Sequence, residues 1–398
     1  MLAIPKTMRA VVYRGVNDLR LETVPVPAIQ PGELLVKVAL CGVCPTDIKK
    51  IQLGAVPPPR IFGHETAGVI AKIGAGAGAR FRIGDRVALH HHIPCLKCHF
   101  CRHRAFAQCP QYKRTGITAG FEPAGGGYAE YVRVMRFVLP GVVKIPARNT
   151  FVEGAMLEPV NTVLKGVNRL DLRRGDAVLV IGQGPIGLLF TRLLQLRGIK
   201  VLATDLMDSR LKLARQWGAA AAFRADAAHL PQKLAAAAPC LDAAVVAVPS
   251  QAAVLQALEL VRGSGKILLF AHTHRQSGRG VPPLSLLPLS SGRPALPRRL
   301  ADPSPASPAS LSSLSSLSPP SLDLATICAD EKDLLGSYSS DFTLQAEVAR
   351  LIFSRKLDIR PLITHHFPLA RTPAAIALAS TPSADSLKIV VNQQLTDE

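Results

Sequence analysis

The sequence predicts a two-domain protein of the α/β-plus-β class: a mostly antiparallel β domain followed by a doubly wound parallel sheet. Three observations carry this prediction. Residues 8–137 consist of short β-rich runs separated by Gly and Pro, which is typical of antiparallel sheets. From residue 174 onward, short apolar runs alternate with segments of helical length, the rhythm of a parallel sheet. The chain has 398 residues, 48% of them hydrophobic, enough for two or three domains of about 150 residues.

In the first part, the predicted strands are Arg9–Tyr13, Glu33–Leu40, Gly68–Ile73 and Asp85–Leu89. In the second part, the buried parallel strands are predicted from VLVIG (178–182), VLATD (201–205), AAFRA (221–225), AAVVAV (243–248) and KILLFA (266–271). Three later elements follow: a last parallel strand within Lys332–Ser339, a helix over Phe342–Arg355 and a closing strand at Leu387–Val391.

Residues 277–322 interrupt this pattern. Thirteen of these residues are Ser, ten are Pro and none is aromatic. Proline removes backbone donors and disfavours regular helices and central strands. We therefore expect a low-complexity, disordered insertion that the fold tolerates.

Composition excludes several classes of protein. No clean apolar run of about 20 residues is available for a membrane span, and Pro5 and two charges stand where a signal peptide has its apolar region. The sequence thus predicts a cytoplasmic protein without a membrane partner. The net charge of +19 leaves nucleic-acid binding as an alternative, but the basic residues are scattered rather than in blocks, which disfavours it.

Four cysteines crowd into one short segment with the spacing C-x2-C-x2-C-x7-C: Cys95, Cys98, Cys101 and Cys109. In an intracellular chain such a cluster indicates metal binding rather than disulfides. Four thiolates suit a closed, tetrahedral structural zinc site. An iron–sulfur cluster is the alternative, because cysteine spacing alone does not select the metal.

This spacing resembles the structural-zinc lobe of the zinc-containing medium-chain alcohol and polyol dehydrogenases. Three further motifs, CGVCPTD (41–47), GHE (63–65) and LEP (157–159), follow the order of the catalytic-zinc ligands in that family. The resemblance implies a catalytic zinc held by Cys44, His64, Glu65 and Glu158, with Asp47 orienting a ligand. No cysteine stands near Glu158 as a third ligand, so the chain is more similar to the polyol and threonine dehydrogenase branch. Whether Glu65 or Glu158 contacts the metal directly stays open.

A third motif, IGQGPIG, follows an apolar strand and opens a helical run. Its glycines form G-x-G-x-x-G, and in this context the motif predicts a dinucleotide site at a helix N-terminus. The loop residues expected to bind the coenzyme are Gly182, Gly184, Pro185, Ile186 and Gly187. Asp205 ends the next strand and would bind the ribose hydroxyls, which favours NAD over NADP because an acid repels a 2′-phosphate. Arg210 is either a helix-surface residue or a lid on the adenine.

The resemblance also implies an architecture. A GroES-like catalytic domain would span residues 1–159 and 341–398, with the structural zinc lobe at 90–112. A Rossmann domain would span residues 160–340 and carry the insertion. The family forms oligomers, so a homodimer or homotetramer is expected, with two zinc ions per subunit, one catalytic and one structural.

In the implied mechanism, zinc activates an alcohol as a Lewis acid and a hydride passes to NAD. Thr46 would begin the proton relay, and it equally suits a helix cap. Lys49 stands where many members have a relay histidine, so either Lys49 or water completes the path, or that outer step is dispensable.

We therefore predict an NAD-dependent zinc dehydrogenase acting on a secondary alcohol such as a polyol or sugar alcohol. The alternative enzyme is L-threonine 3-dehydrogenase, which would need partners for an ammonium and a carboxylate. The segment Ile51–Pro59 predicts an apolar pocket wall and so argues against it. The alternative outside the enzyme class is a zinc-stabilised nucleic-acid-binding protein that has kept the fold.

Overall fold

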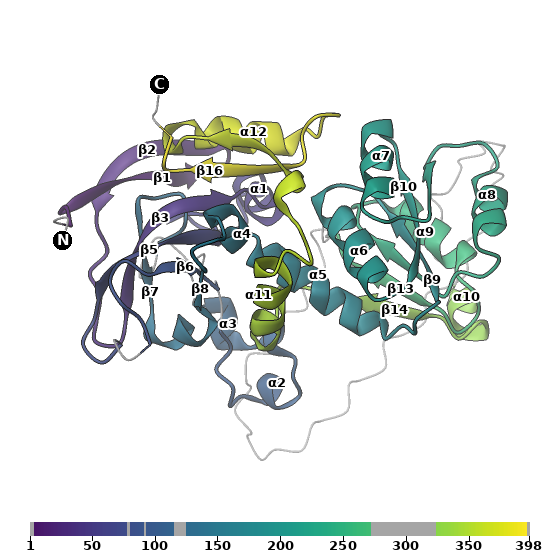
Figure 1. Ribbon diagram of the computed structural model, residues 1–398, viewed down its shortest axis with the longest axis horizontal. Coiled ribbons are helices and arrows are strands. Elements are labelled where there is room, and N and C mark those ends of the chain that lie inside the picture. Colours follow the sequence, from purple (N-terminus) through teal and green to yellow (C-terminus); the bar gives the residue numbers. More distant parts are fainter. Residues whose placement is uncertain (1–3, 78–79, 91–92, 115–124, 272–323, 396–398) are drawn as a thin grey trace, which may run out of the picture.

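The computed structural model describes residues 4–77, 80–90, 93–114, 125–271 and 324–395 (Figure 1). The predicted insertion at 277–322 lies outside these residues. Among the described helices, none is both long and apolar enough to cross a membrane.

Two sheets built from the N-terminal part and the C-terminal end make up one half of the molecule. The strands are β1 (Thr7–Gly15), β2 (Asp18–Pro25), β3 (Leu34–Gly42), β4 (Arg60–Ile61), β5 (Glu65–Ile73), β6 (Arg86–Ala88), β7 (Tyr131–Val134), β8 (Val143–Lys144), β15 (Ile363–Phe367) and β16 (Lys388–Asn392). One sheet has the order β2-β1-β4. The other has the order β15-β16-β3-β5-β6-β8, with β7 paired to β3. Apart from the β15–β16 pair, all of these pairings are antiparallel.

The helices of this half are short. They are α1 (Pro45–Leu53), α2 (His99–Arg102), α3 (Pro110–Arg114), α4 (Phe151–Ala155), α11 (Gln345–Phe353) and α12 (Thr372–Ser380). Short 3-10 turns lie at Phe106–Gln108, Arg136–Gly141, Phe342–Leu344, Arg360–Leu362 and Leu369–Arg371.

The second half is a six-stranded, fully parallel sheet with the order β11-β10-β9-β12-β13-β14. Its strands are β9 (Ala177–Ile181), β10 (Lys200–Asp205), β11 (Ala221–Arg224), β12 (Ala243–Val246), β13 (Lys266–Leu269) and β14 (Asp333–Gly336). Its helices are α6 (Pro185–Leu196), α7 (Asp208–Gln216), α8 (Leu230–Ala237), α9 (Gln251–Leu260) and α10 (Leu324–Ala329). Every strand predicted from the apolar runs is present, and the predicted fold class is confirmed. The strand order reverses next to β9, where doubly wound sheets bind their ligands.

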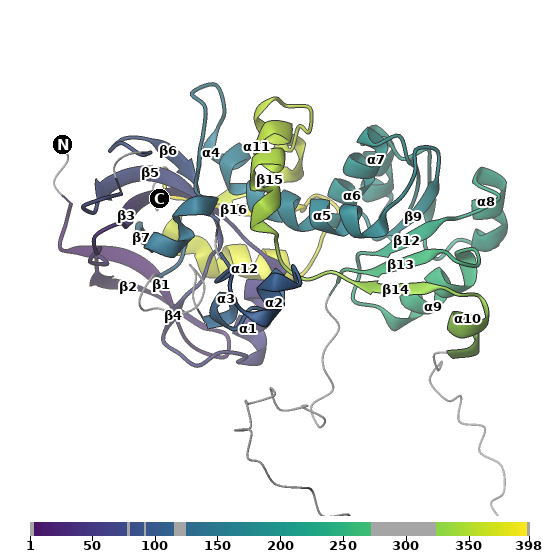
Figure 2. The ribbon, with the colours of Figure 1, turned by 90° about the horizontal axis from the view of Figure 1, so that it is seen from below.

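Helix α5 (Leu157–Leu170) joins the two halves (Figures 1 and 2). Ten of its residues are buried, whereas Asn168 and Arg169 are exposed, so a wide apolar face packs into the protein and a polar face remains outside. Its side chains belong to one continuous apolar cluster that reaches from Ala67 in β5 to Val201 in β10. Gly166 lets α5 lie close to Phe190 of α6, because a Cβ at position 166 would be 2.8 Å from the Phe190 ring. The core therefore fixes both halves against the helix that carries Glu158 in its first turn.

Candidate active site and metal centres

Cys44, His64 and Glu65 come together where strand β3 passes into helix α1 and strand β5 begins. One potential ligand atom from each lies within 4.8 Å of the others. The antiparallel pairing of β3 with β5 brings these residues together, because it places Glu65 opposite Gly42. Cys44 follows Gly42 closely and is the N-cap of α1. Its Sγ accepts a hydrogen bond from the Thr46 backbone N–H over 3.4 Å.

Two glycines make this convergence possible. A Cβ at position 42 would lie 1.8 Å from Glu65 Oε2, so a side chain there would displace the carboxylate. Gly63 has φ +97°, and a Cβ there would lie 2.8 Å from Cys41 Sγ. The glycines in CGVCPTD and GHE are therefore steric requirements of the site.

Asp47 holds the His64 ring. Its Oδ1 lies 3.1 Å from His64 Nδ1, and both side chains are buried. Tyr128 donates a long hydrogen bond to the other Asp47 oxygen over 3.5 Å. Burial opposes the charged form of His64, but Asp47 and Cys44 outweigh burial and raise the pKa of His64. A carboxylate on the second ring nitrogen is the usual support for a metal-ligating histidine.

Glu65 is paired with a cation that sequence reasoning missed. The Nζ of Lys388 lies 2.7 Å from Glu65 Oε1 and 2.5 Å from Oε2, and it also donates to the Val43 carbonyl over 2.8 Å. Lys388 is only 5% exposed. Burial lowers its pKa, but Glu65 and Cys44 more than offset burial, so the pKa of Lys388 is raised. No local motif marks this lysine, because it lies 323 residues after Glu65.

Glu158 faces the same centre but lies outside the group of three. Its Oε1 accepts a hydrogen bond from Thr162 Oγ1 over 3.3 Å. Burial raises the pKa of Glu158 to about 7, and the nearby Glu65 carboxylate acts in the same direction. Of the two glutamates, the structure therefore brings Glu65 into the compact group with Cys44 and His64.

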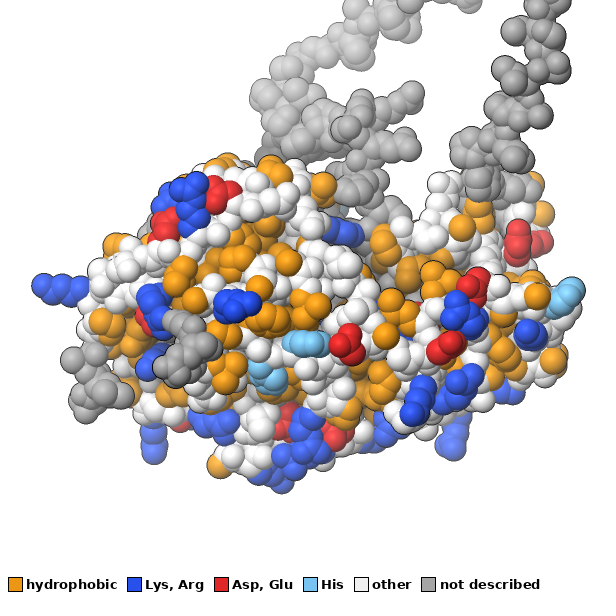
Figure 3. Space-filling view, turned by 90° about the horizontal axis from the view of Figure 1, so that it is seen from above, with side chains coloured by type: hydrophobic (Ala, Val, Ile, Leu, Met, Phe, Trp, Pro, Cys, Tyr) orange, Lys and Arg blue, Asp and Glu red, His pale blue; other side chains and the backbone are white. Residues whose placement is uncertain are grey.

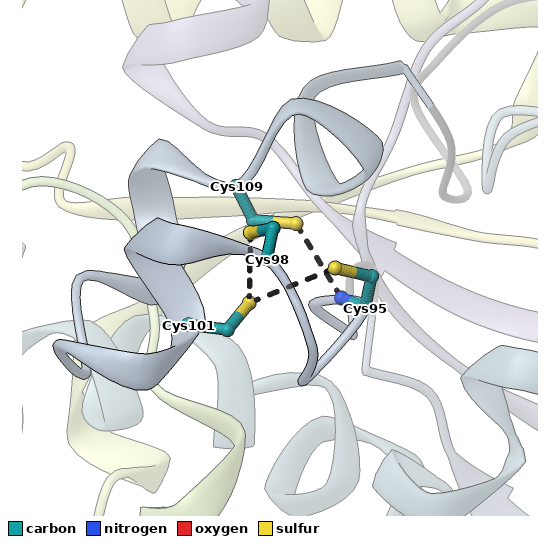
Figure 4. A group of neighbouring side chains, drawn as sticks. All are labelled: Cys95, Cys98, Cys101 and Cys109. Atoms are coloured by element: carbon teal, nitrogen blue, oxygen red, sulfur yellow. Dashed lines mark hydrogen bonds between the residues drawn. The ribbon is translucent and has the colours of Figure 1, made fainter.

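The four clustered cysteines meet in a small lobe formed by α2, α3 and the turns beside them (Figure 4). Cys98 Sγ lies 3.5 Å and Cys95 Sγ 3.9 Å from Cys101 Sγ. Tetrahedral zinc with bonds of about 2.3 Å places its sulfurs about 3.8 Å apart, so the cluster fits that ion. Backbone N–H groups of Lys97 and Cys98 lower the pKa of Cys95 to about 6, which favours the thiolate that metals bind.

The glycine-rich loop has the close packing that a dinucleotide cradle requires. Gly182 has φ +90°, and a Cβ at Gly187 would lie 1.7 Å from the Gly182 carbonyl oxygen. Gly184 is the N-cap of α6, and Pro185 and Ile186 begin that helix. Asp205 accepts hydrogen bonds from the backbone N–H of Gln183 over 2.6 Å and of Met207 over 2.9 Å.

Arg210 lies beside Asp205 rather than on the outer helix surface. Its Nη1 is 4.0 Å from Asp205 Oδ2, and its side chain is 13% exposed. It lines the same cleft as the glycine-rich loop.

One cleft of about 810 Å³ is lined by both the metal-binding group and the dinucleotide loop, and Figure 3 shows a hollow between the two halves. Thr46, Lys49 and Glu158 line it too. Tyr112, which sequence reasoning missed, reaches it from the cysteine lobe and hydrogen-bonds Ser339.

Two expectations need correction. Helix α1 begins at Pro45 with Cys44 as its N-cap, so Thr46 does not cap it. The wall near Ile51–Pro59 is not purely apolar, because Gln52 lines the cleft and Lys50 and Arg60 flank that stretch.

Several known proteins resemble this chain over nearly its whole length. Residues 30–147 match the family described as "Alcohol dehydrogenase GroES-like domain", and residues 185–291 match "Zinc-binding dehydrogenase". The chain is 26% identical to a sorbitol dehydrogenase of Bombyx mori over 97% of this chain and 98% of that protein. It is 27% identical to a sorbitol dehydrogenase of Gallus gallus, over 100% of this chain and 99% of that one. The fold resembles that of 2R,3R-butanediol dehydrogenase from Bacillus subtilis, with TM-score 0.76 and 20% identity, covering 97% of this chain and 99% of that one.

Lys388→Met is expected to lower the free energy of unfolding by about 3–5 kcal/mol, because it leaves the Glu65 carboxylate buried without its counter-charge. The double variant Glu65→Gln, Lys388→Met should recover most of this loss, since it removes both charges. Denaturant unfolding of both variants beside the wild type tests the coupling. Equal losses in the single and double variants would show that Lys388 stabilises the fold only through its packing.

Cys101→Ser is expected to remove one metal ion per chain and to lower the midpoint of thermal unfolding, because a closed four-thiolate site contributes folding energy directly. The matched control is Cys240→Ser, since Cys240 is exposed and lies outside the cluster. Elemental analysis of both purified variants supplies the measurement. Unchanged zinc content in Cys101→Ser would contradict the structural zinc site.

Proposed function

Because this chain belongs to the zinc-containing medium-chain dehydrogenase family, we propose that it oxidises a secondary alcohol of the polyol or sugar-alcohol class with NAD as hydride acceptor. The observation that carries the proposal is the shared cleft. Cys44, His64 and Glu65 line one part of it, and the glycine-rich loop of α6 lines another. An alcohol carbon and a nicotinamide can meet only where these two parts face each other.

The donor set fits a catalytic zinc ion. A thiolate, an imidazole and a carboxylate are the ligand types that zinc accepts, and three protein ligands leave a position for substrate. We assign Cys44, His64 and Glu65 as these ligands, with Glu158 facing the same centre. When bound, zinc supplies Lewis-acid polarisation of the substrate oxygen, which lowers the pKa of the alcohol.

The protein's own residues provide the support for this chemistry. Asp47 orients His64, and Lys388 neutralises the Glu65 carboxylate so that it can stay buried beside Cys44. The Thr46 hydroxyl stands at the cleft in the first turn of α1, where it can accept the proton that the alcohol releases. Lys49 lies one helical turn further on and lines the cleft as well. We propose that the proton leaves through Thr46 and then through Lys49 or water.

The coenzyme residues support NAD over NADP. Asp205 is fixed by two backbone N–H groups at the end of β10, and its carboxylate would repel a 2′-phosphate. We propose that Arg210, which lies beside Asp205 and lines the cleft, covers the adenine. We further propose that the chain works as a homodimer or homotetramer, as the family does.

Reduction of NAD by the zinc-loaded protein, followed at 340 nm, tests the proposed function. The panel should contain sorbitol, xylitol, galactitol, butanediol, simple secondary alcohols and L-threonine. Turnover of a polyol or secondary alcohol, and its loss after chelation, is the expected result. Turnover of L-threonine alone would move the assignment to L-threonine 3-dehydrogenase. No turnover of any member, with zinc and NAD both bound, would contradict the proposal.

Thr46→Ala is expected to lower kcat by roughly 100-fold with little change in the NAD dissociation constant, because it removes the first proton acceptor. Thr46→Ser retains the hydroxyl and should keep most of the activity. Steady-state kinetics with the best substrate of the panel compares the two variants. Equal activity in Thr46→Ala and wild type would exclude Thr46 from the relay.

A further inference from the structure

A second cavity, of about 400 Å³, lies where the cysteine lobe meets α5 and the ends of β13 and β14. We call it the basic cavity and define it by Arg104, Lys165, Arg169, Phe270, Ser337 and Tyr338. Three of these residues, Phe270, Ser337 and Tyr338, also line the catalytic cleft. The two spaces therefore share a wall. None of the residues assigned above to zinc or NAD lines the basic cavity.

The cavity has a strongly positive lining. Among its described lining residues, Arg104, Lys165 and Arg169 are cations and none is a carboxylate. In the part of the chain that the structure describes, none of the three forms a salt bridge. Three cations converging on one hollow repel one another, and an anion between them relieves that repulsion.

Lys165 is held at the cavity by the backbone. Its Nζ donates to the Tyr338 carbonyl over 2.8 Å and to the Ser339 carbonyl over 3.3 Å. These bonds orient the ammonium group. Carbonyl oxygens carry no formal charge, and the Asp341 carboxylate acts on the ammonium only from beyond salt-bridge distance. Arg104 and Arg169 are exposed, so their guanidinium groups can adapt to an entering ligand.

The Ser337 hydroxyl is independent evidence for a ligand in the basic cavity. Its side-chain oxygen is buried and has no hydrogen-bond partner among the described residues, and the residue is only 8% exposed. Buried hydroxyls in native proteins nearly always have a partner, and one that has none calls for an explanation. A ligand oxygen in the cavity would supply the acceptor that this hydroxyl lacks.

We infer that the basic cavity binds a small phosphate-bearing anion. A phosphate group offers several acceptor oxygens, which suits two guanidinium forks, one ammonium and one hydroxyl arriving from different sides. The site is separate from the proposed coenzyme site, whose phosphates lie at the N-terminus of α6. Because the shared wall includes Phe270 and Tyr338, the bound anion touches residues that also border the catalytic cleft.

Titration calorimetry with inorganic phosphate tests this inference on the full-length, zinc-loaded protein. The protein should be saturated with NAD, so that the coenzyme's phosphate site is already filled, and the ionic strength should be held constant. Wild type is expected to bind phosphate saturably. Arg169→Gln and Lys165→Gln should each weaken binding roughly tenfold or more, the usual effect of losing one charge-assisted contact. Lys233→Gln removes the same charge from the exposed surface of α8 and should change nothing.

One further variant and one further ligand make the test decisive. Ser337→Ala should weaken phosphate binding, and Arg169→Gln keeps the test valid if Lys165→Gln does not fold, because Arg169 is exposed. The absence of saturable binding in wild type, or equal weakening by Lys233→Gln, would overturn the inference. Binding of acetate as tight as that of phosphate would overturn the assignment to a phosphate group.

Discussion

The buried ion pair between Glu65 and Lys388 is the contact on which the rest of the site depends. It joins the first residue of β5 to the first residue of β16, and β16 pairs with β3 beside Gly42 and Cys41. Two charges taken out of water are stable only as a well-hydrogen-bonded pair. The C-terminal strand therefore supplies the counter-charge that lets the Glu65 carboxylate stay buried next to Cys44 and His64. Residues from the N-terminal part and from the C-terminal end of the chain therefore both support the metal centre.

Steric constraints explain why the motifs CGVCPTD, GHE and IGQGPIG contain glycine. Gly42, Gly63 and Gly187 each lie where a Cβ would come within 3 Å of another atom, twice within 2 Å. These glycines let carboxylate, thiol and backbone groups approach more closely than any side chain allows. The same principle thus operates in both halves of the cleft: at the metal-binding group it admits the Glu65 carboxylate, and at the dinucleotide loop it closes the turn before α6.

Most of the fold and the local parts of the site could be predicted from the sequence. The parallel strands could be predicted because each of them is an apolar run that is continuous in the sequence. The cysteine cluster could be predicted because its four members lie within one lobe. Lys388 and Tyr112 could not be found in this way, because each acts on residues hundreds of positions away. The wall near Ile51–Pro59 was predicted to be apolar although Gln52 lies within it, because the sequence does not show which side chains of that stretch face the cleft. The basic cavity likewise draws on four separate segments, so no motif marks it.

The most direct measurement follows the hydride itself. A secondary alcohol of the active panel, carrying deuterium at the carbinol carbon, is incubated with the zinc-loaded protein and NAD, and the reduced coenzyme is analysed by mass spectrometry. Direct transfer within the shared cleft predicts one deuterium in each reduced coenzyme, with no dilution by solvent protons. Reduced coenzyme without the label, or label lost to water, would show that the alcohol carbon and the nicotinamide do not meet in this cleft.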